Sequence, residues 1–431
     1  MASARCFDAV LFDLDGTLVA TDRFWIESAE RGTRRALREL GLTRALPTPQ
    51  QWLSLVGLPL EVGFRALFPE LREGDRQAVL KACVEEEEAM LRQGVVLAMP
   101  GAREVVERLH ARGFALGIAS NCQQSYLDHM LDALALRGFV RAAYCRESPG
   151  VSSKGDMVAR LLADFETRSA VMVGDRASDR DAAWENGIPH IHCAFGFAQG
   201  DEAVEAEGRL DSLSELEPLL ERRGRWIEQA LERVGAFERP GLRLGITGGP
   251  AAGKTLFARD AARLLAVRGR PAAAVSLADF APERTAPGAD ALDTAVDLAR
   301  LERELLAPHE AGVSVSLRVP DLLGQHTIPA GAVLVLEGAA LLGARLRAGL
   351  DRLIHLDLPE TVSWRRLQGR NGRREGPLAV AQVLQTLLPV QRALELRFPP
   401  RLSSDLVLDG TNPLGAGPPG NGGLPGGEPA R

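Results

Sequence analysis

The stretch from Phe7 to Asp22, FDAVLFDLDGTLVATD, constrains the fold of this chain more than any other. Its apolar run at residues 9–12 predicts a buried parallel strand. Two carboxylates, Asp13 and Asp15, follow where the strand ends, on one side of it and about 7 Å apart. Buried acids need a partner or a metal ion. We therefore expect a catalytic site at this strand end, the alternative being an acidic edge without a metal.

The length of the chain, 431 residues, predicts two to three domains. Its five cysteines lie far apart in the first half and form neither a disulfide framework nor a CxxC metal pair, as expected of a cytoplasmic protein. We expect no secretory segment and no membrane span. The net charge of −6 argues against a nucleic-acid partner.

The turn after the first strand carries the first family resemblance. Gly16 and Thr17 complete DxDGT, which resembles the first motif of the haloacid dehalogenase-like (HAD) phosphohydrolases. The next strand, FALGIASN, ends in Ser120, and Lys154 begins a later helix; both positions resemble the second and third motifs. GDRASD, with Asp175 and Asp179, resembles the fourth motif of the phosphoglycolate-phosphatase-like branch. Four motifs in order are more specific than any one of them.

This resemblance implies a mechanism. Asp13 attacks phosphorus to form an aspartyl-phosphate, and Asp15 protonates the leaving oxygen and later activates water. Ser120 and Lys154 hold the charge on the transferred group. An oxygen-only ligand set favours Mg²⁺ over a softer metal. We expect that set to consist of Asp13, Asp15, Asp175 and Asp179.

The region at about 20–97 is helical in pattern, with few β-branched runs. In the resembled family a small cap domain occupies this place, closes over the active site and selects the substrate. Trp52, Gly57, Leu58 and Pro59 fall where such a cap sends a loop toward the site, although a core tryptophan and an ordinary turn are the simpler explanation.

A second site is expected after Pro240. The segment LRLGITGGPAAGKTLFARDAARLL reads as a strand, a glycine-rich turn and a helix, and residues 248–255 fit GxxxxGK[ST]. The loop, from Gly248 to Gly253, cradles nucleotide phosphates, Lys254 reaches the outer phosphates, and Thr255 takes Mg²⁺. We therefore expect ATP as a second cofactor.

The strands after this loop resemble the uridine kinase and phosphoribulokinase-like kinases, which phosphorylate small-molecule hydroxyls. The resemblance implies that Asp279 is the base, that Glu337 positions Mg²⁺, and that Arg370 belongs to an arginine-rich lid. Ala278 stands where the base aligns best in that family. Two interpretations therefore stay open: Asp279 acts as the base after a small loop shift, or it only caps a turn.

Together these patterns predict an α/β protein with two doubly wound parallel sheets and a helical cap inserted in the first. The expected division is a phosphatase domain at 1–221, a helical linker at 222–241, a kinase-like domain at 242–410 and a disordered tail at 411–431. The expected function is bifunctional, phosphomonoester hydrolysis plus ATP-dependent phosphorylation of a nucleoside or sugar-like acceptor. The alternatives are a phosphatase with an inactive ATP-binding regulatory domain, and a nucleic-acid end-healing kinase-phosphatase.

Overall fold

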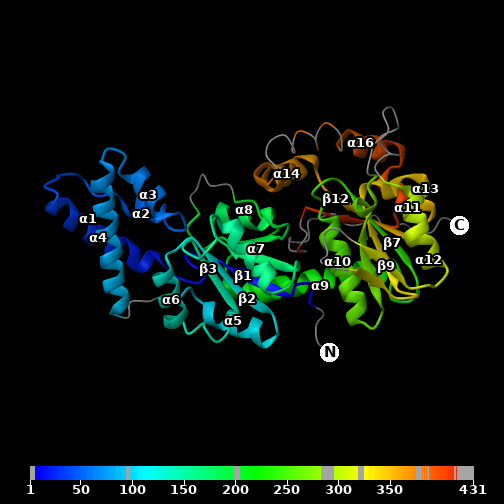
Figure 1. Ribbon diagram of the computed structural model, residues 1–431, viewed down its shortest axis with the longest axis horizontal. Helices are drawn as coiled ribbons and strands as arrows, with labels where there is room; N and C mark the ends of the chain where they lie inside the picture. Colours follow the sequence, from blue (N-terminus) through cyan, green and yellow to red (C-terminus); the bar gives the residue numbers. More distant parts are fainter. Residues whose placement is uncertain are drawn as a thin grey trace.

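The computed structural model describes residues 5–93, 98–198, 204–282, 296–318, 325–374, 381, 383, 385, 388–411 and 414, without the side chains of 318, 325–326, 369–374 and 390. Two parallel sheets organise these residues, one in each half of the chain (Figure 1). The predicted α/β class with two parallel sheets is therefore confirmed. No described helix combines the length and the apolar character needed to cross a bilayer.

The first sheet has the strand order β3-β2-β1-β4-β5-β6, and all of its pairs are parallel. Its central strands are continuous apolar runs, because both faces are covered. In β1, Ala9 and Leu11 pack on one helical layer, and Val10 and Phe12 on the other. The strands are β1 (Ala9–Phe12), β2 (Ala115–Ser120), β3 (Ala142–Cys145), β4 (Ala170–Gly174), β5 (His190–Cys193) and β6 (Gly208–Leu210).

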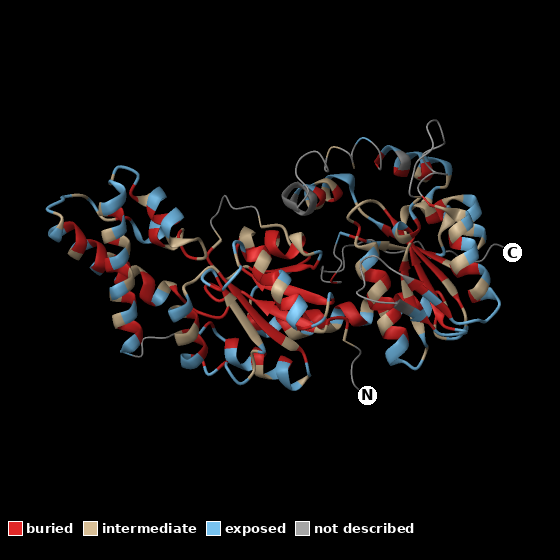
Figure 2. Ribbon diagram, viewed as in Figure 1, coloured by how far each residue is buried: buried red, intermediate tan, exposed pale blue. Residues whose placement is uncertain are grey.

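Helices lie on both faces of this sheet, as Figure 2 shows by the buried strands between partly exposed helices. The layer on the Leu11 face contains α7 and α8, and the opposite layer contains α5, α6 and α9. These helices are α5 (Ala102–Ala111), α6 (Gln124–Ala133), α7 (Lys154–Asp164), α8 (Ala177–Glu185) and α9 (Leu216–Arg233), the last preceded by the short helix η1 (Leu213–Glu215).

The insertion after β1 is helical, as the sequence predicts, and it stands beyond one end of the sheet (Figure 1). Gly32 lets the first and last of its helices approach closely, because a Cβ there would lie 2.5 Å from the Cα of Cys83. Trp52 is fully buried among aromatic rings of this cap, so it is a core residue. The cap helices are α1 (Asp22–Glu39), α2 (Pro49–Leu53), α3 (Leu60–Leu67) and α4 (Glu73–Arg92).

One continuous helix, α9, joins the two halves, and the expected boundary at residue 221 falls inside it. Its start is tied to the first half, since Arg112 pairs with Glu217 and Glu221 at 2.6 and 2.7 Å. Its middle is tied to the second half by the buried pair Arg223–Asp260. The helix is therefore part of both cores.

The second sheet has the order β13-β12-β7-β11-β8, again parallel throughout. Its first strand, β7, lies where the sequence predicts one, directly before the glycine-rich turn. An antiparallel pair, β9 and β10, was not predicted. The strands are β7 (Arg243–Gly248), β8 (Ala272–Ser276), β9 (Val315–Arg318), β10 (Gln325–Ile328), β11 (Val333–Glu337), β12 (Arg352–Asp357) and β13 (Leu406–Asp409).

The helices of the second half surround this sheet. The segment LARLERELLAPHEAG contains two short α-helical stretches with a π-helical turn between them. The helices are α10 (Lys254–Val267), η2 (Leu277–Phe280), α11 (Leu298–Leu301), η3 (Glu302–Leu306), α12 (Ala307–Glu310), η4 (Ala339–Leu342), α13 (Ala344–Ala348), α14 (Glu360–Arg374), α16 (Leu388–Arg397) and α17 (Pro400–Ser403).

Candidate active sites

The carboxyl edge of the first sheet gathers the acidic residues of the N-terminal half. Asp13 follows β1 directly, and Asp175 follows the neighbouring strand β4. Asp179 lies in the first turn of α8. Ligand oxygens of these three buried carboxylates lie within 4.8 Å of one another. Parallel strands end at the same edge of a sheet, so the strand order alone brings Asp13 and Asp175 together.

Lys154 supplies the positive charge of this cluster. It is the first residue of α7, and its Nζ lies 2.6 Å from Asp13 Oδ1 and 2.5 Å from Asp179 Oδ1. Burial alone would lower the pKa of Lys154, but the two carboxylates outweigh it and raise that pKa. The lysine is therefore a fixed ammonium among three carboxylates.

Burial raises the pKa of Asp13 to about 7 although Lys154 opposes the shift. Burial also raises the pKa of Asp175 well above its usual range, and the nearby Asp13 and Asp179 add to that rise. Two carboxylate oxygens, Asp13 Oδ2 and Asp175 Oδ1, are buried without a hydrogen-bond partner among the described residues. Buried oxygens with this much unrelieved negative charge fit a divalent cation held by oxygen ligands.

The backbone is shaped around Asp175. Gly16 has a φ of +76°, and a Cβ there would lie 2.3 Å from Asp175 Oδ2, so only glycine fits. The N–H of Phe197 donates to the same oxygen at 2.5 Å. Sequence reasoning missed Phe197, because an apolar side chain gives no sign that its backbone N–H serves a carboxylate.

The carboxylate of Asp15 lies apart from the acidic cluster. Its Oδ1 accepts hydrogen bonds from Thr21 Oγ1 at 2.5 Å and from Tyr126 Oη at 2.6 Å. Burial raises the pKa of Asp15, although these two hydroxyls lower it. The structure therefore groups Asp13, Asp175 and Asp179 as candidate metal ligands and leaves the Asp15 side chain outside that group, unlike the set expected from the sequence.

A loop of the cap contacts the core next to Asp15. Asn121 Nδ2 donates to the carbonyl of Gly57 at 3.0 Å, and Arg176 Nη1 donates to the carbonyl of Val56. Ser120, the last residue of β2, is buried and directly precedes Asn121 in the sequence. The loop containing Gly57 and Leu58 therefore lies toward the site. Of the two interpretations of these residues, an ordinary turn and a cap loop directed at the site, the second describes their position.

The cavity behind this loop contains residues that sequence reasoning did not single out. Asp15, Thr21 and Tyr126 line it together with Glu87 of α4. Glu87 was visible in the sequence only as part of the acidic run 85–88, in which Glu85 and Glu88 are exposed. Local sequence pattern could not identify Tyr126 or Glu87 as lining residues. Tyr126 lies 111 positions from Asp15, and the packing of α4 decides which of its residues face the cavity.

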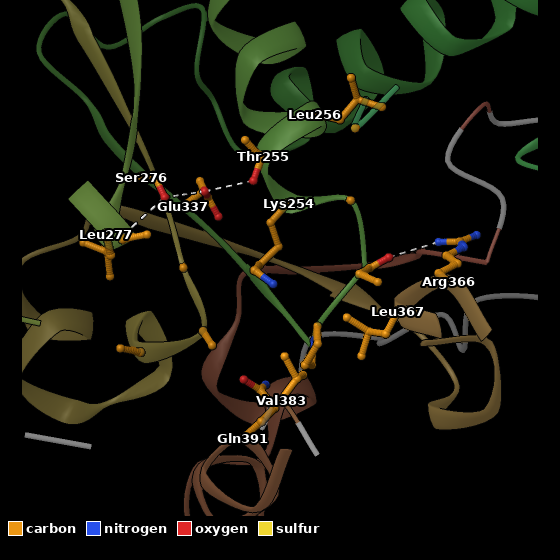
Figure 3. Close-up of a pocket in the computed structure, with 18 of the residues that line it drawn as sticks. Lys254, Thr255, Leu256, Ser276, Leu277, Glu337, Arg366, Leu367, Val383 and Gln391 are labelled. Atoms are coloured by element: carbon orange, nitrogen blue, oxygen red, sulfur yellow. Dashed lines mark hydrogen bonds between the residues drawn. The ribbon is translucent and has the colours of Figure 1, made fainter. Parts of the chain in front are cut away.

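In the second half, a cavity of about 500 Å³ lies at the carboxyl edge of its sheet (Figure 3). Lys254, the first residue of α10, points into it, and its Nζ donates to the carbonyl of Gly249 at 2.8 Å. Glu337, at the end of β11, accepts hydrogen bonds from Thr255 Oγ1 at 3.0 Å and Ser276 Oγ at 2.6 Å (Figure 3). The structure thus brings three of the expected residues together.

Glycine geometry supports this loop. Gly253 has a φ of +85° directly before α10, and a Cβ on Gly248 would lie 2.5 Å from the carbonyl oxygen of Leu356. A side chain at Gly248 is excluded by contact with β12, and at Gly253 any other residue is disfavoured by the positive φ of the turn into the helix. This is the strand-turn-helix context that the loop pattern requires.

Asp279 does not share this cavity. It lies in η2 and lines a separate hollow with Arg300 and Glu304, whereas Ala278 lines the cavity with Lys254. Arg366 of α14 reaches the cavity and donates to the carbonyl of Ala251 at 3.3 Å. The side chain of Arg370, and the tail from 415 onward, lie outside the described residues.

The first half contributes a wall to the same cavity. Trp184 and Glu207 line it, and Trp184 Nε1 donates to both carboxylate oxygens of Glu207 at 3.1 Å. Glu207 also lies 3.8 Å from Arg366 Nε. The two halves therefore meet at this site.

Comparisons with known proteins concern the N-terminal half. Residues 10–193 match the family model described as haloacid dehalogenase-like hydrolase. A 5'-nucleotidase of Pseudomonas aeruginosa is 28% identical over 205 residues, which span 46% of this chain and 88% of that protein. A phosphoglycolate phosphatase of Caulobacter vibrioides is 29% identical over 212 residues, 46% of this chain and 83% of that protein.

Among solved structures, one from Haemophilus somnus, described as a predicted phosphoglycolate phosphatase, has a TM-score of 0.44 at 18% identity, covering 50% of this chain and 98% of that one. The family match ends at residue 193, at the last residue of β5, and begins inside β1. It therefore spans the strands that precede Asp13 and Asp175 and the helix that begins at Lys154. Residues 10–193 are therefore similar to the haloacid dehalogenase-like hydrolases over the part of the chain that contains the cap and both strands that precede Asp13 and Asp175.

Proposed function

We propose that the N-terminal half hydrolyses phosphomonoesters through an aspartyl-phosphate on Asp13. The observation that supports this proposal is the difference between the surroundings of the two carboxylate oxygens of Asp13. Its Oδ1 is held by Lys154 at 2.6 Å, while its Oδ2 is buried without a partner among the described residues. One oxygen is thus fixed and the other is available to attack, which is the arrangement that a carboxylate nucleophile needs.

The reaction has two steps. Asp13 Oδ2 bonds to phosphorus while the bond to the leaving oxygen breaks, and that oxygen takes a proton from Asp15. Water then attacks phosphorus and gives its proton to Asp15, and the acyl-phosphate bond breaks to release phosphate and restore Asp13. Burial raises the pKa of Asp15, which favours the protonated form that the first step requires.

We propose that Asp13, Asp175 and Asp179 hold Mg²⁺, since their oxygens lie within 4.8 Å of one another. The ion would neutralise charge on the transferred phosphoryl group. Lys154 fixes Asp13, and Ser120 at the neighbouring strand end offers a hydroxyl to a phosphoryl oxygen. The relatives named for nucleotides and for phosphoglycolate suggest a small phosphate ester as substrate.

The test is hydrolysis of p-nitrophenyl phosphate with Mg²⁺ by the full chain. Asp13→Asn removes the nucleophile, and we expect kcat to fall by about four orders of magnitude or more. Asp211→Asn is the matched control, because this aspartate side chain is 78% exposed. Activity retained in Asp13→Asn would refute the assignment.

We propose a second function for the C-terminal half, binding of a nucleoside triphosphate such as ATP with Mg²⁺. The Thr255–Glu337 hydrogen bond next to Lys254 supports it, because a hydroxyl and a carboxylate beside a lysine suit a magnesium phosphate. Gly248 and Gly253 shape the loop that would surround the phosphates. On this proposal α9 joins two functional units. The proposed location of both is the cytoplasm.

Calorimetric titration with ATP and Mg²⁺ tests this binding. Lys254→Ala should weaken ATP binding at least about tenfold while hydrolysis of p-nitrophenyl phosphate stays unchanged. Equal ATP affinity in the variant would refute the role of the loop. The same variant therefore separates the two proposed functions.

Phosphoryl transfer from ATP to a nucleoside or sugar hydroxyl needs a base near the outer phosphates. Asp279 lines another hollow, so ATP binding without transfer has the stronger structural support. ADP formation across a panel of nucleosides and sugars distinguishes a kinase from a regulatory ATP-binding unit. A labelled oligonucleotide with a 5'-hydroxyl and a 3'-phosphate tests the end-healing alternative.

A further inference from the structure

The cavity beside Asp15 lies between the cap and the core, where the leaving group of the proposed hydrolysis would be. Six polar residues line it: Asp15, Thr21, Glu87, Asn121, Gln123 and Tyr126. Trp25, Leu55 and Leu58 form an apolar wall. Because Asp15 would protonate the leaving oxygen, the rest of that group must occupy this space.

Glu87 is the residue of this cavity that the proposed hydrolysis does not use. Its side chain is buried, 9% exposed, and it makes no hydrogen bond or ion pair with the part of the chain that the structure describes. Burial, together with the charge of Asp15, raises the pKa of Glu87 to about 8. At neutral pH it is therefore mainly an uncharged carboxyl that can both donate and accept a hydrogen bond.

Its neighbours on α4 behave differently. Glu85 pairs with Arg35 at 2.5 Å, and Glu88 pairs with Arg92 at 3.5 Å, both on the solvent side of the helix. Surface acids on a helix are ordinarily solvated or paired in this way. A buried acid that faces a cavity without a partner is unfavourable unless something in that cavity bonds to it.

The charge of the cavity limits what that ligand is. No lysine, arginine or histidine is found among its thirteen described lining residues. Arg176 contacts the loop through the carbonyl of Val56, and it does not line the cavity. An anionic leaving group would therefore be removed from water in this cavity without a counter-charge, and burying an unpaired charge is strongly unfavourable.

The size of the cavity limits the ligand further. Its volume is about 60 Å³. This is room for about four to six water-sized groups, since each needs about 10–15 Å³ on this measure. The hydrogen bond from Asn121 to the carbonyl of Gly57 holds the cap loop against the core at this cavity. A nucleoside is much larger than this volume, whereas a three-carbon polyol, with six non-hydrogen atoms, fits it.

We infer that the phosphatase acts on the phosphate ester of a small uncharged polyol, whose hydroxyls bond to Glu87, Tyr126 and Asn121. This inference rests on the proposed phosphatase function and specifies its substrate class. This substrate class differs from the substrates that the names of the two relatives give. Phosphoglycolate carries a carboxylate, and a nucleotide carries a base.

A matched pair of substrates tests it, because glycerol 3-phosphate and 3-phosphoglycerate differ chiefly in a hydroxymethyl group against a carboxylate. For the full chain with Mg²⁺ we expect kcat/KM at least about tenfold higher for glycerol 3-phosphate. We expect the same advantage over 2-phosphoglycolate, phosphoethanolamine and adenosine 5'-monophosphate. A preference for any of these four would overturn the inference.

Two pairs of variants test whether Glu87 determines the preference for glycerol 3-phosphate over 3-phosphoglycerate. Glu87→Lys places a cation in the cavity and should narrow the glycerol 3-phosphate to 3-phosphoglycerate ratio about tenfold. Glu88→Lys makes the same change on the solvent side of α4 and should leave the ratio unchanged. If Glu87→Lys does not fold, Glu87→Gln should narrow the ratio about threefold above pH 8, where Glu87 of the wild type carries a negative charge, and Glu88→Gln should not. An unchanged ratio in both Glu87 variants would overturn the role of this residue.

The failures are distinguishable. If Asp13→Asn abolishes hydrolysis of p-nitrophenyl phosphate and the wild-type protein still prefers 3-phosphoglycerate, the substrate inference alone is wrong. If no ester is hydrolysed in a manner that depends on Asp13, the proposed phosphatase function and the substrate inference are both wrong.

Discussion

Replacing Asp175 with asparagine should stabilise the metal-free protein and remove its response to Mg²⁺. The carboxylate of Asp175 lies within 4.8 Å of those of Asp13 and Asp179. Two like charges at that distance repel by about 3.5 kcal/mol at an effective dielectric of about 20. Proton uptake relieves part of this repulsion, since the pKa of Asp175 is raised by burial and by both neighbours. We expect a gain of about 2 kcal/mol in the free energy of unfolding.

The substitution leaves the local backbone bond in place, because an asparagine oxygen still accepts from the N–H of Phe197. The measurement is urea unfolding near pH 7.5, in EDTA and then in Mg²⁺. In EDTA the variant should be the more stable protein. In Mg²⁺ the wild type should gain about 2.7 kcal/mol at a concentration one hundred times its Kd, and the variant much less.

The exposed Asp211 provides the control, since Asp211→Asn should change stability by less than about 0.5 kcal/mol in either condition. A variant that is no more stable than the wild type in EDTA would show that the three carboxylates do not repel one another as their positions require. An equal response to Mg²⁺ in the two proteins would remove Asp175 from the proposed metal site.

Two further predictions concern other buried charges. The pKa of Glu87 is raised from 4.5 to about 8, so the folded state binds more protons than the unfolded state between these values and its stability falls as pH rises through them. Glu87→Gln should match wild-type stability at pH 4.5 and exceed it by up to about 5 kcal/mol above pH 8. The titratable groups around Glu87 are Asp15, Tyr126 and Glu88. Parallel pH profiles of stability for the variant and the wild type would contradict this prediction. Arg223→Met should lower the free energy of unfolding by about 3–5 kcal/mol, because it leaves the fully buried Asp260 unpaired, and Arg223→Met/Asp260→Leu should recover most of the loss. Losses that simply add in the double variant would show that the two side chains do not form the pair.

The sequence already contained most of the fold, because both halves repeat one pattern, a short apolar run that ends in polar residues. Such a run is buried on both faces in a parallel sheet, so it does not alternate and is easy to recognise. The helical cap was predicted from the lack of such runs after β1. The pair β9–β10 was missed because residues 313–319 alternate apolar and polar side chains and so lack the continuous apolar run that marks the strands of the two parallel sheets.

The candidate acidic site was predictable for a related reason. Asp13 and Asp175 each follow a strand directly, and Asp179 lies one helical turn further along. Parallel strands deliver their carboxyl ends to one edge, so convergence follows from connectivity. The same holds for Lys254 and Glu337 in the second half. The position of Asp279 was not predictable, because the short helix η2 turns it away from that edge.

What the sequence by itself determined is therefore the set of groups carried by strand ends, since each needs only its own strand and the shared edge. Only the tertiary structure decided which residues face Asp15. Tyr126 comes from α6 and Glu87 from α4, and each reaches the cavity through the packing of an entire helix against the core or the cap. Helix rotation depends on that packing and not on local pattern, so the residues that would select the substrate become visible only when the cap is in place.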